Sequence, residues 1–201
     1  MTHEPRVLEG VLGTIAPPLK RHGVRFALVG GLAVAIRGQV RFTKDVALAV
    51  VLADDPSVER LVRALASSGF SPGAIVEQEA VGRIATVRLR SKSGVIVDLL
   101  VASSGIEAEI VERAAEVAFG TAGAVLVAQA EELLAMKLLS MRPARPNDRA
   151  DALALLATNP SLDLDRVRQD LALIRARGFD RGEDLEGKLA ELLAARESLD
   201  E

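Results

Sequence analysis

Apolar residues recur along this chain with two different spacings, and the spacing changes past its middle. Between residues 24 and 102, short apolar runs are separated by turn residues, which is typical of strands joined by helices and hairpins. The pattern predicts strands over 24–29, 45–52, 83–90 and 95–102. The last two are separated by the turn 91–94, so we expect them to pair as an antiparallel hairpin.

Helical spacing of three and four residues marks the other segments. It predicts helices over 6–21, 31–37, 56–68, 131–141, 148–157, 164–175 and 184–197, with one more short strand at 124–127. The Pro17–Pro18 pair is expected to kink or interrupt the first helix. We therefore predict an α/β fold: a mixed sheet core with flanking helices over residues 1–127, followed by a helical C-terminal lobe over residues 128–201.

Composition narrows the classes of function. The chain has 201 residues, 49% of them hydrophobic and 26% charged, which is typical of a globular protein. It has no cysteine, which excludes disulfides and thiolate metal sites, and a formal charge of −3, which disfavours a globally basic nucleic-acid binder. Neither a signal peptide nor an apolar stretch long enough for a bilayer is evident. We expect a cytoplasmic protein with no membrane partner.

A glycine turn and two acids are the features most suggestive of chemistry. Gly30 and Gly31 separate a predicted strand from a short helix, and the amides at a helix start can bind a phosphate group. Asp45 opens the next strand, and Thr43 precedes it. Asp98 stands alone in the apolar run 95–101, where a carboxylate needs a hydrogen bond, an ion pair or a metal.

These residues resemble the opening motif of the nucleotidyltransferase superfamily. The similarity is to the minimal AbiEii-type toxin nucleotidyltransferases, which carry a Gly-Gly or Gly-Ser turn followed by Thr-x-Asp-x-Asp. Ala47 stands where the second Asp of that motif is expected. The resemblance implies a nucleotidyltransferase fold and transfer of NMP from an NTP to an acceptor, often RNA such as tRNA. It also implies a cognate antitoxin protein as a partner.

The resemblance further implies a site for two Mg²⁺ ions held by three carboxylates. Asp45 matches the first of these and Asp98 the third, so both are predicted metal ligands and catalytic residues, while Ala47 marks the missing acid. A methyl group cannot bind Mg²⁺, and we expect turnover to fall by about two orders of magnitude. Natural loss and deliberate inactivation both remain open as the origin of Ala47. Nucleotide binding is assigned to residues of the first motif, namely Gly30, Gly31, Arg37, Thr43 and Lys44.

A second group of residues lies in the predicted C-terminal lobe. Lys137 follows Leu133 and Leu134 on the apolar face of a helix, and Arg145, Asp148 and Asp151 come shortly after it. In the family that this resembles, such a lysine supports the triphosphate and the acids brace the basic residues. We therefore assign Lys137 to catalysis and nucleotide binding and Asp151 to the nucleotide site. Asp148 has the simpler alternative of a helix cap, and Lys137 that of a lysine at the rim of the core.

Two other functions stay open. The first is an NTP-binding pseudoenzyme or interaction module that uses the fold without turnover. The second is a small-molecule nucleotidyltransferase of the aminoglycoside type. One arm of the predicted hairpin carries Arg83, Arg88 and Arg90. These arginines would bind a triphosphate or an RNA end if they face the cleft. Their presence is explained equally well if they are charged side chains that a strand exposes to solvent.

Overall fold

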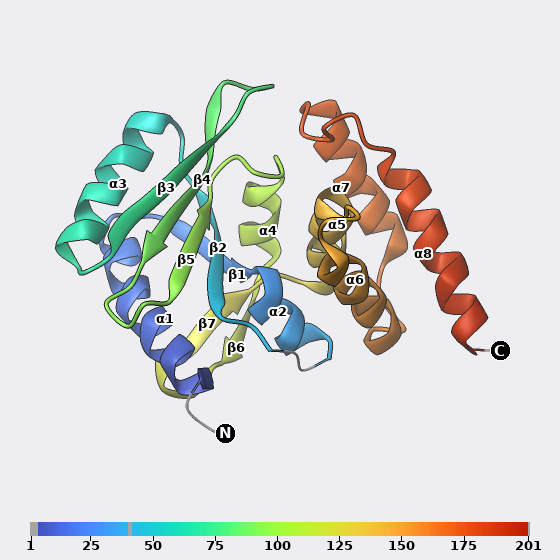
Figure 1. Cartoon of the computed structure of the whole chain (residues 1–201), viewed down its shortest axis with the longest axis horizontal. Helices are drawn as coiled ribbons and strands as arrows, with labels where there is room; N and C mark the ends of the chain where they lie inside the picture. Colours follow the sequence, from blue (N-terminus) through green and yellow to red (C-terminus); the bar gives the residue numbers. More distant parts are fainter. Residues whose placement is uncertain (1–3, 40–41, 201) are drawn as a thin grey trace.

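The computed structural model describes residues 4–39 and 42–200. Within them, seven strands form one mixed sheet in the order β3-β4-β5-β2-β1-β7-β6 (Figure 1). The strands are β1 Arg25–Val29, β2 Asp45–Val51, β3 Ser71–Gln78, β4 Arg83–Arg90, β5 Ile96–Leu100, β6 Ala115–Ala118 and β7 Ala124–Val127. The predicted α/β fold with a mixed sheet is confirmed.

The middle of the sheet sets the geometry of the site. Strand β2 pairs antiparallel with β1 and parallel with β5, and β5 pairs antiparallel with β4 as the predicted hairpin. Strands β2 and β5 are almost entirely apolar, and Val46, Leu48, Val97 and Leu99 are fully buried. Because alternate residues of a strand face opposite sides, these four side chains anchor one face and leave the residues between them on the other.

Strand β3 was not predicted from the sequence. It pairs with β4 at one edge of the sheet and is exposed over most of its length. It carries Pro72 and Gly73 near its start, where the register shifts, and it has no alternation of buried and exposed positions. Ile75 and Val76 are each 54% exposed. A strand that buries neither face gives no periodic signal in the sequence.

Helices cover both sides of the sheet (Figure 1). Helices α1 and α3 lie on the side away from the C-terminal lobe, and α2 and α4 lie toward it. Their bounds are α1 Glu4–Arg21, α2 Gly30–Arg37, α3 Asp55–Ser67 and α4 Glu107–Arg113, with a 3-10 turn at Gly120–Ala122. Helix α1 runs through Pro17 and Pro18, so the predicted interruption is wrong. Its apolar face, including the fully buried Ile15 and Leu19, keeps the segment packed on the core.

After β7, every element in the described part of the chain is a helix. These helices are α5 Ala130–Ser140, α6 Pro146–Thr158, α7 Leu164–Ala176 and α8 Leu185–Asp200. Helix α5 contacts the other three and also α2, so it is the central helix of this lobe. Asp163 caps α7 as expected for a residue at that position, accepting from the amides of Asp165 and Arg166. None of the described helices is long and apolar enough to span a bilayer.

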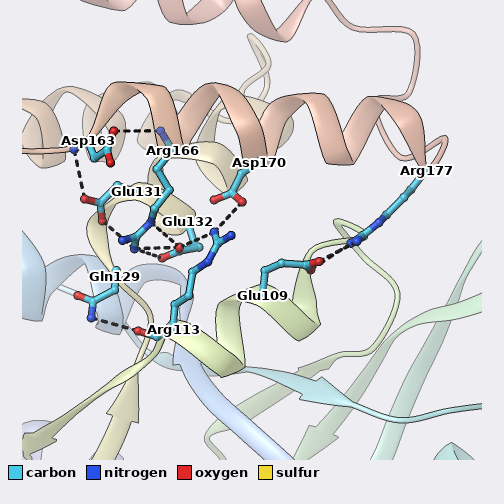
Figure 2. Close-up of polar contacts among 9 residues, drawn as sticks. All are labelled: Glu109, Arg113, Gln129, Glu131, Glu132, Asp163, Arg166, Asp170 and Arg177. Atoms are coloured by element: carbon cyan, nitrogen blue, oxygen red, sulfur yellow. Dashed lines mark hydrogen bonds and ion pairs between the residues drawn. The ribbon is translucent and has the colours of Figure 1, made fainter.

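A buried ionic network joins the two parts of the molecule (Figure 2). Arg113 at the end of α4 donates to Glu132 of α5 at 3.1 Å and to Asp170 of α7 at 2.9 Å. Both acceptor side chains are fully buried. Arg166 of α7 also donates to Glu132, and Gln129 donates to the Arg113 carbonyl. This network fixes α5, and therefore Lys137, relative to the sheet.

Candidate active site

Two strands place the first set of predicted residues on one face of the sheet. Asp45 and Ala47 are two positions apart on β2, so their side chains share a face. Ala47 is paired across the parallel ladder with Asp98 of β5, while Asp45 is paired with Ile96. Asp98 is therefore the direct neighbour of Ala47 and the diagonal neighbour of Asp45. The two acids flank the position where the family motif expects a third.

The glycine turn lies against the same position. Gly30 begins α2 with a φ of +69°, a left-handed conformation that favours glycine. A Cβ added at Gly30 would lie 3.0 Å from the Ala47 Cβ, which leaves no room for a larger residue at the turn. The residue before α2, Val29, provides no side-chain cap. The first turn of α2 thus starts beside Ala47, and Val29 gives its amides no side-chain hydrogen bond.

Asp98 has a partner that the sequence did not reveal. Arg88, opposite Asp98 on β4, donates from Nε to Oδ1 at 2.8 Å and from Nη2 to Oδ2 at 2.9 Å. This two-pronged pair raises the pKa of Arg88 through its hydrogen bonds to Asp98, and the charges of Asp98 and Asp45 add to the effect. The lone acid in an apolar strand is explained by this arginine. Its position could be found only once the register of the hairpin was known.

The C-terminal lobe supplies a second ionic group. Lys137 of α5 is 8% exposed, and its Nζ lies 2.7 Å from Asp148 Oδ1 and 2.8 Å from Asp151 Oδ2. Arg145 Nε lies 3.1 Å from the other oxygen of Asp148. The arrangement of a lysine braced by two acids on the next helix is what the resemblance implied. Asp148 lies in the first turn of α6, where no side-chain cap bond forms, and its oxygens pair with Lys137 and Arg145 instead.

Residues from both parts of the chain meet in one pocket of about 350 Å³. Gly30, Ala47 and Asp98 lie on its sheet side, and Lys137, Arg145 and Asp148 lie on its helical side. Ser103 and Ser104, from the loop after β5, also line it. That loop is held in place by the buried Glu107, which accepts from three backbone amides, those of Ser103, Ser104 and Gly105.

Sequence reasoning also missed Arg181, which lines the pocket from the turn between α7 and α8. Its Nη2 donates to the Ser103 carbonyl at 3.2 Å, so it connects the helical lobe to the loop after β5. Its φ is +58°, and no other non-glycine residue in the described part of the chain has a positive φ. Desolvation, followed by repulsion from Arg142 and Arg145, lowers the pKa of Arg181. Only the tertiary fold could place this arginine near Asp98.

Some predicted residues lie elsewhere. Arg37 is at the far end of α2, roughly 10 Å from its start, and donates to the carbonyls of Val127 and Ala128 at 3.2 and 3.0 Å. It ties α2 to the end of β7, and this placement gives no support to its predicted contact with a nucleotide. Thr43 and Lys44 line a separate shallow depression with residues 93–95. Lys44 Nζ is 5.3 Å from the centroid of the Phe42 ring.

The residues present do not fit a site for two Mg²⁺ ions. No group of three acidic, histidine or cysteine side chains within residues 4–39 and 42–200 is placed to hold a metal ion. Ala47 contributes a methyl group where a ligand is expected, and Arg88 already binds both oxygens of Asp98. A divalent ion prefers several oxygen ligands. Among the residues that the structure describes, this face offers one carboxylate without an arginine ion pair, that of Asp45.

Comparisons with known proteins agree with the geometry. A family model described as "Nucleotidyl transferase AbiEii toxin, Type IV TA system" matches residues 18–201. A comparison with curated proteins gives no significant match.

Among solved structures, an antigenic nucleotidyltransferase-like protein from Paracoccidioides brasiliensis is similar, with 20% identity, coverage of 94% of this chain and 93% of that chain, and a TM-score of 0.50. The antibiotic-resistance factor ANT(2'')-Ia in solution has 17% identity, coverage of 86% and 93%, and a TM-score of 0.53. At these identities the two structures establish the fold alone.

Proposed function

This chain belongs to the AbiEii nucleotidyl transferase toxin family, and we propose that it is built to transfer NMP from an NTP to an acceptor hydroxyl on RNA, such as tRNA. Like other members of a toxin–antitoxin family, it would act in the cytoplasm and be opposed by a cognate antitoxin. The form with Ala47 would be strongly impaired, because a metal-binding carboxylate is replaced by a methyl group.

The observation that carries this proposal is the alignment of four positions at one pocket. Asp98 and Ala47 are paired across two strands, Gly30 starts a helix beside them, and Lys137 faces them from the helical lobe. In the proposed transfer, the acceptor oxygen bonds to the α-phosphorus and the bond to the β-phosphate oxygen breaks, releasing pyrophosphate. The acceptor hydroxyl loses a proton. Asp98 is the carboxylate on the pocket wall that would take it, through the lone pairs that its two hydrogen bonds from Arg88 leave open.

An RNA acceptor is favoured by the surface beside Asp45. Phe42 is 61% exposed, and Lys44 lies close to its ring, at one end of β2. An exposed aromatic ring with a neighbouring cation can stack a nucleobase and hold its phosphate. Since Asp45 follows Lys44 in the sequence, a base stacked on Phe42 would bring its own ribose toward Asp45.

The test restores the missing acid. The purified protein with Ala47 and its variants Ala47→Asp and Ala47→Asn are each given labelled NTPs and Mg²⁺, with bulk tRNA and an aminoglycoside as parallel acceptors. We expect Ala47→Asp to label RNA at least about a hundredfold faster than the form with Ala47. Ala47→Asn is the matched control, because it adds the same volume without the charge.

The other outcomes distinguish the competing functions. Label on the aminoglycoside and not on RNA would replace the RNA acceptor by a small molecule. No label in any form, together with retained nucleotide binding, would favour a pseudoenzyme. Growth arrest on expression of Ala47→Asp, and not of Ala47→Asn, would support the toxin role, and its absence would contradict that role.

A further inference from the structure

The pocket that joins the two lobes carries more basic than acidic side chains. Four basic residues line it, Arg88, Lys137, Arg145 and Arg181, together with the acids Asp98 and Asp148. Asp151 also pairs with Lys137, so one positive charge remains in excess. Arg142 adds a further positive charge that acts on Arg181. An excess of cations around a concave site attracts an anionic ligand and concentrates it there.

The acids of the pocket are already neutralised within the protein. Arg88 binds both oxygens of Asp98, and Lys137 and Arg145 together bind both oxygens of Asp148. A polyphosphate entering this pocket therefore does not meet bare carboxylates. In a site with three unpaired acids, divalent ions would be needed to remove that repulsion. Here Arg88 supplies the positive charge at Asp98 that an ion would otherwise provide.

Arg181 is the basic residue of the pocket with the weakest charge compensation. Among the described residues it forms no ion pair, and its one hydrogen bond is to a backbone carbonyl, that of Ser103. Its neighbours Arg142 and Arg145 repel it, and Glu183 attracts it more weakly. Its backbone is left-handed, a conformation that a residue other than glycine adopts at a cost, and its side chain lines the pocket. Such an arrangement is relieved when an anion binds between the arginines.

We propose that this pocket holds the triphosphate group of a nucleotide through Arg145 and Arg181 without a divalent metal, while Arg88 keeps Asp98 neutralised. This inference rests on the proposed function, since it names how that site holds its nucleotide. The planar guanidinium groups donate two parallel hydrogen bonds to a phosphate. Binding and catalysis then have separate requirements, because the nucleotide is held by arginines and only its transfer needs the acid missing at residue 47.

The test measures binding by calorimetry with inorganic tripolyphosphate, ATP and AMP, each in EDTA and again with Mg²⁺. We expect tripolyphosphate and ATP to bind in EDTA, AMP to bind much more weakly, and Mg²⁺ to leave the affinity unchanged or lower it, because the ion screens the ligand charge. Arg181→Gly and Arg145→Ala should each weaken tripolyphosphate binding about tenfold. Arg168→Ala is the matched control, because this exposed arginine of the same lobe pairs with Asp165 away from the pocket.

Arg181→Gly also separates binding from folding. Glycine accepts a positive φ without strain, so thermal stability should be retained while affinity is lost. Three results would overturn the proposal. The first is that tripolyphosphate does not bind in EDTA, and the second is that Mg²⁺ tightens its binding by about tenfold or more. The third is that Arg181→Gly and Arg168→Ala bind tripolyphosphate with equal affinity. Because this experiment measures binding, the arginine site would still be supported if Ala47→Asp failed to transfer NMP. Likewise, NMP transfer by Ala47→Asp would still support the proposed function if the arginine variants bound tripolyphosphate normally.

Discussion

Gly30 and Ala47 face each other so closely that a Cβ built on the glycine would lie 3.0 Å from the methyl of the alanine. The contact joins the start of α2 to the middle of β2, which are the two elements that the family motif connects. Any residue at position 47 therefore sits beside the first amide of the helix. An acid restored there would have the amides of α2 and the carboxylate of Asp98 as its neighbours.

Gly30→Ala tests this contact. The substitution places a side chain at a φ of +69° and against Ala47, so we expect a loss of about 1–2 kcal/mol in the free energy of unfolding. Urea denaturation followed by circular dichroism would measure it. Gly10→Ala is the control: it lies inside α1, its added Cβ meets nothing within 4 Å, and it should be neutral or stabilising. Equal stability of both variants would show that the turn tolerates a side chain.

Lys137→Met tests the ionic group of the helical lobe. Removing the ammonium group leaves Asp148 and Asp151 buried without their shared cation, and we expect a loss of about 3–5 kcal/mol in the free energy of unfolding. Lys20→Met, an exposed lysine at the end of α1, is the comparison and should change stability little. If Lys137→Met unfolds with the native midpoint, the lysine is not the counter-ion of these acids.

Asp170 gives a prediction for pH. Desolvation raises the pKa of this fully buried carboxyl despite its hydrogen bond to Arg113. A carboxyl with a raised pKa binds its proton more tightly in the folded state, so its contribution to stability is full at low pH. That contribution is lost as the pH rises from the ordinary aspartate range through the raised pKa.

Asp170→Asn should remove this dependence. Relative to the native protein, the variant should gain stability as the pH rises through that window, whatever its stability at the lowest pH. Unfolding midpoints of both proteins across mildly acidic pH would measure the difference. A constant difference at all pH values would show that Asp170 titrates at its ordinary pKa.

Phe42→Ala tests the acceptor surface in the Ala47→Asp background. If a base of the RNA stacks on the exposed ring, its removal should cost about 1–3 kcal/mol of RNA binding and slow RNA labelling accordingly. Tripolyphosphate affinity should not change, because Phe42 does not line the pocket. Ile75→Ala is the control, because Ile75 is an apolar residue of β3 that is also more than half exposed, at 54%. Labelling that depends on neither residue would remove Phe42 from the acceptor site.

Local patterns in the sequence were sufficient for the central strands and for one face of the site. The strand, glycine turn, helix and strand from residue 25 to 51 are set by short-range apolar spacing and by Gly30. The shared face of Asp45, Ala47 and Asp98 follows from strand parity once β2 and β5 are known to pair. Helical spacing predicts that Lys137 lies on an apolar face, and the structure buries it, while its assignment to the site comes from the family resemblance.

What the sequence could not supply depends on distant contacts. Arg88 meets Asp98 only through the register of the hairpin, and Arg181 reaches Ser103 across 78 positions of the chain. Arg37 is predicted to bind the nucleotide because it flanks the first motif, and its hydrogen bonds to the carbonyls at the end of β7 could not be foreseen from local spacing. Strand β3 was missed because it has no buried face from which a period could be read.

The exposed edge of β3 has a consequence for handling the protein. Its outer backbone groups and the side chains of Ile75 and Val76 are open to solvent, and such an edge can template the addition of a strand from another molecule. Pro72 protects only the first part of the strand. Overproduction should therefore favour inclusion bodies that grow from this edge, and a lysine in place of Ile75 should raise the yield of dispersed protein.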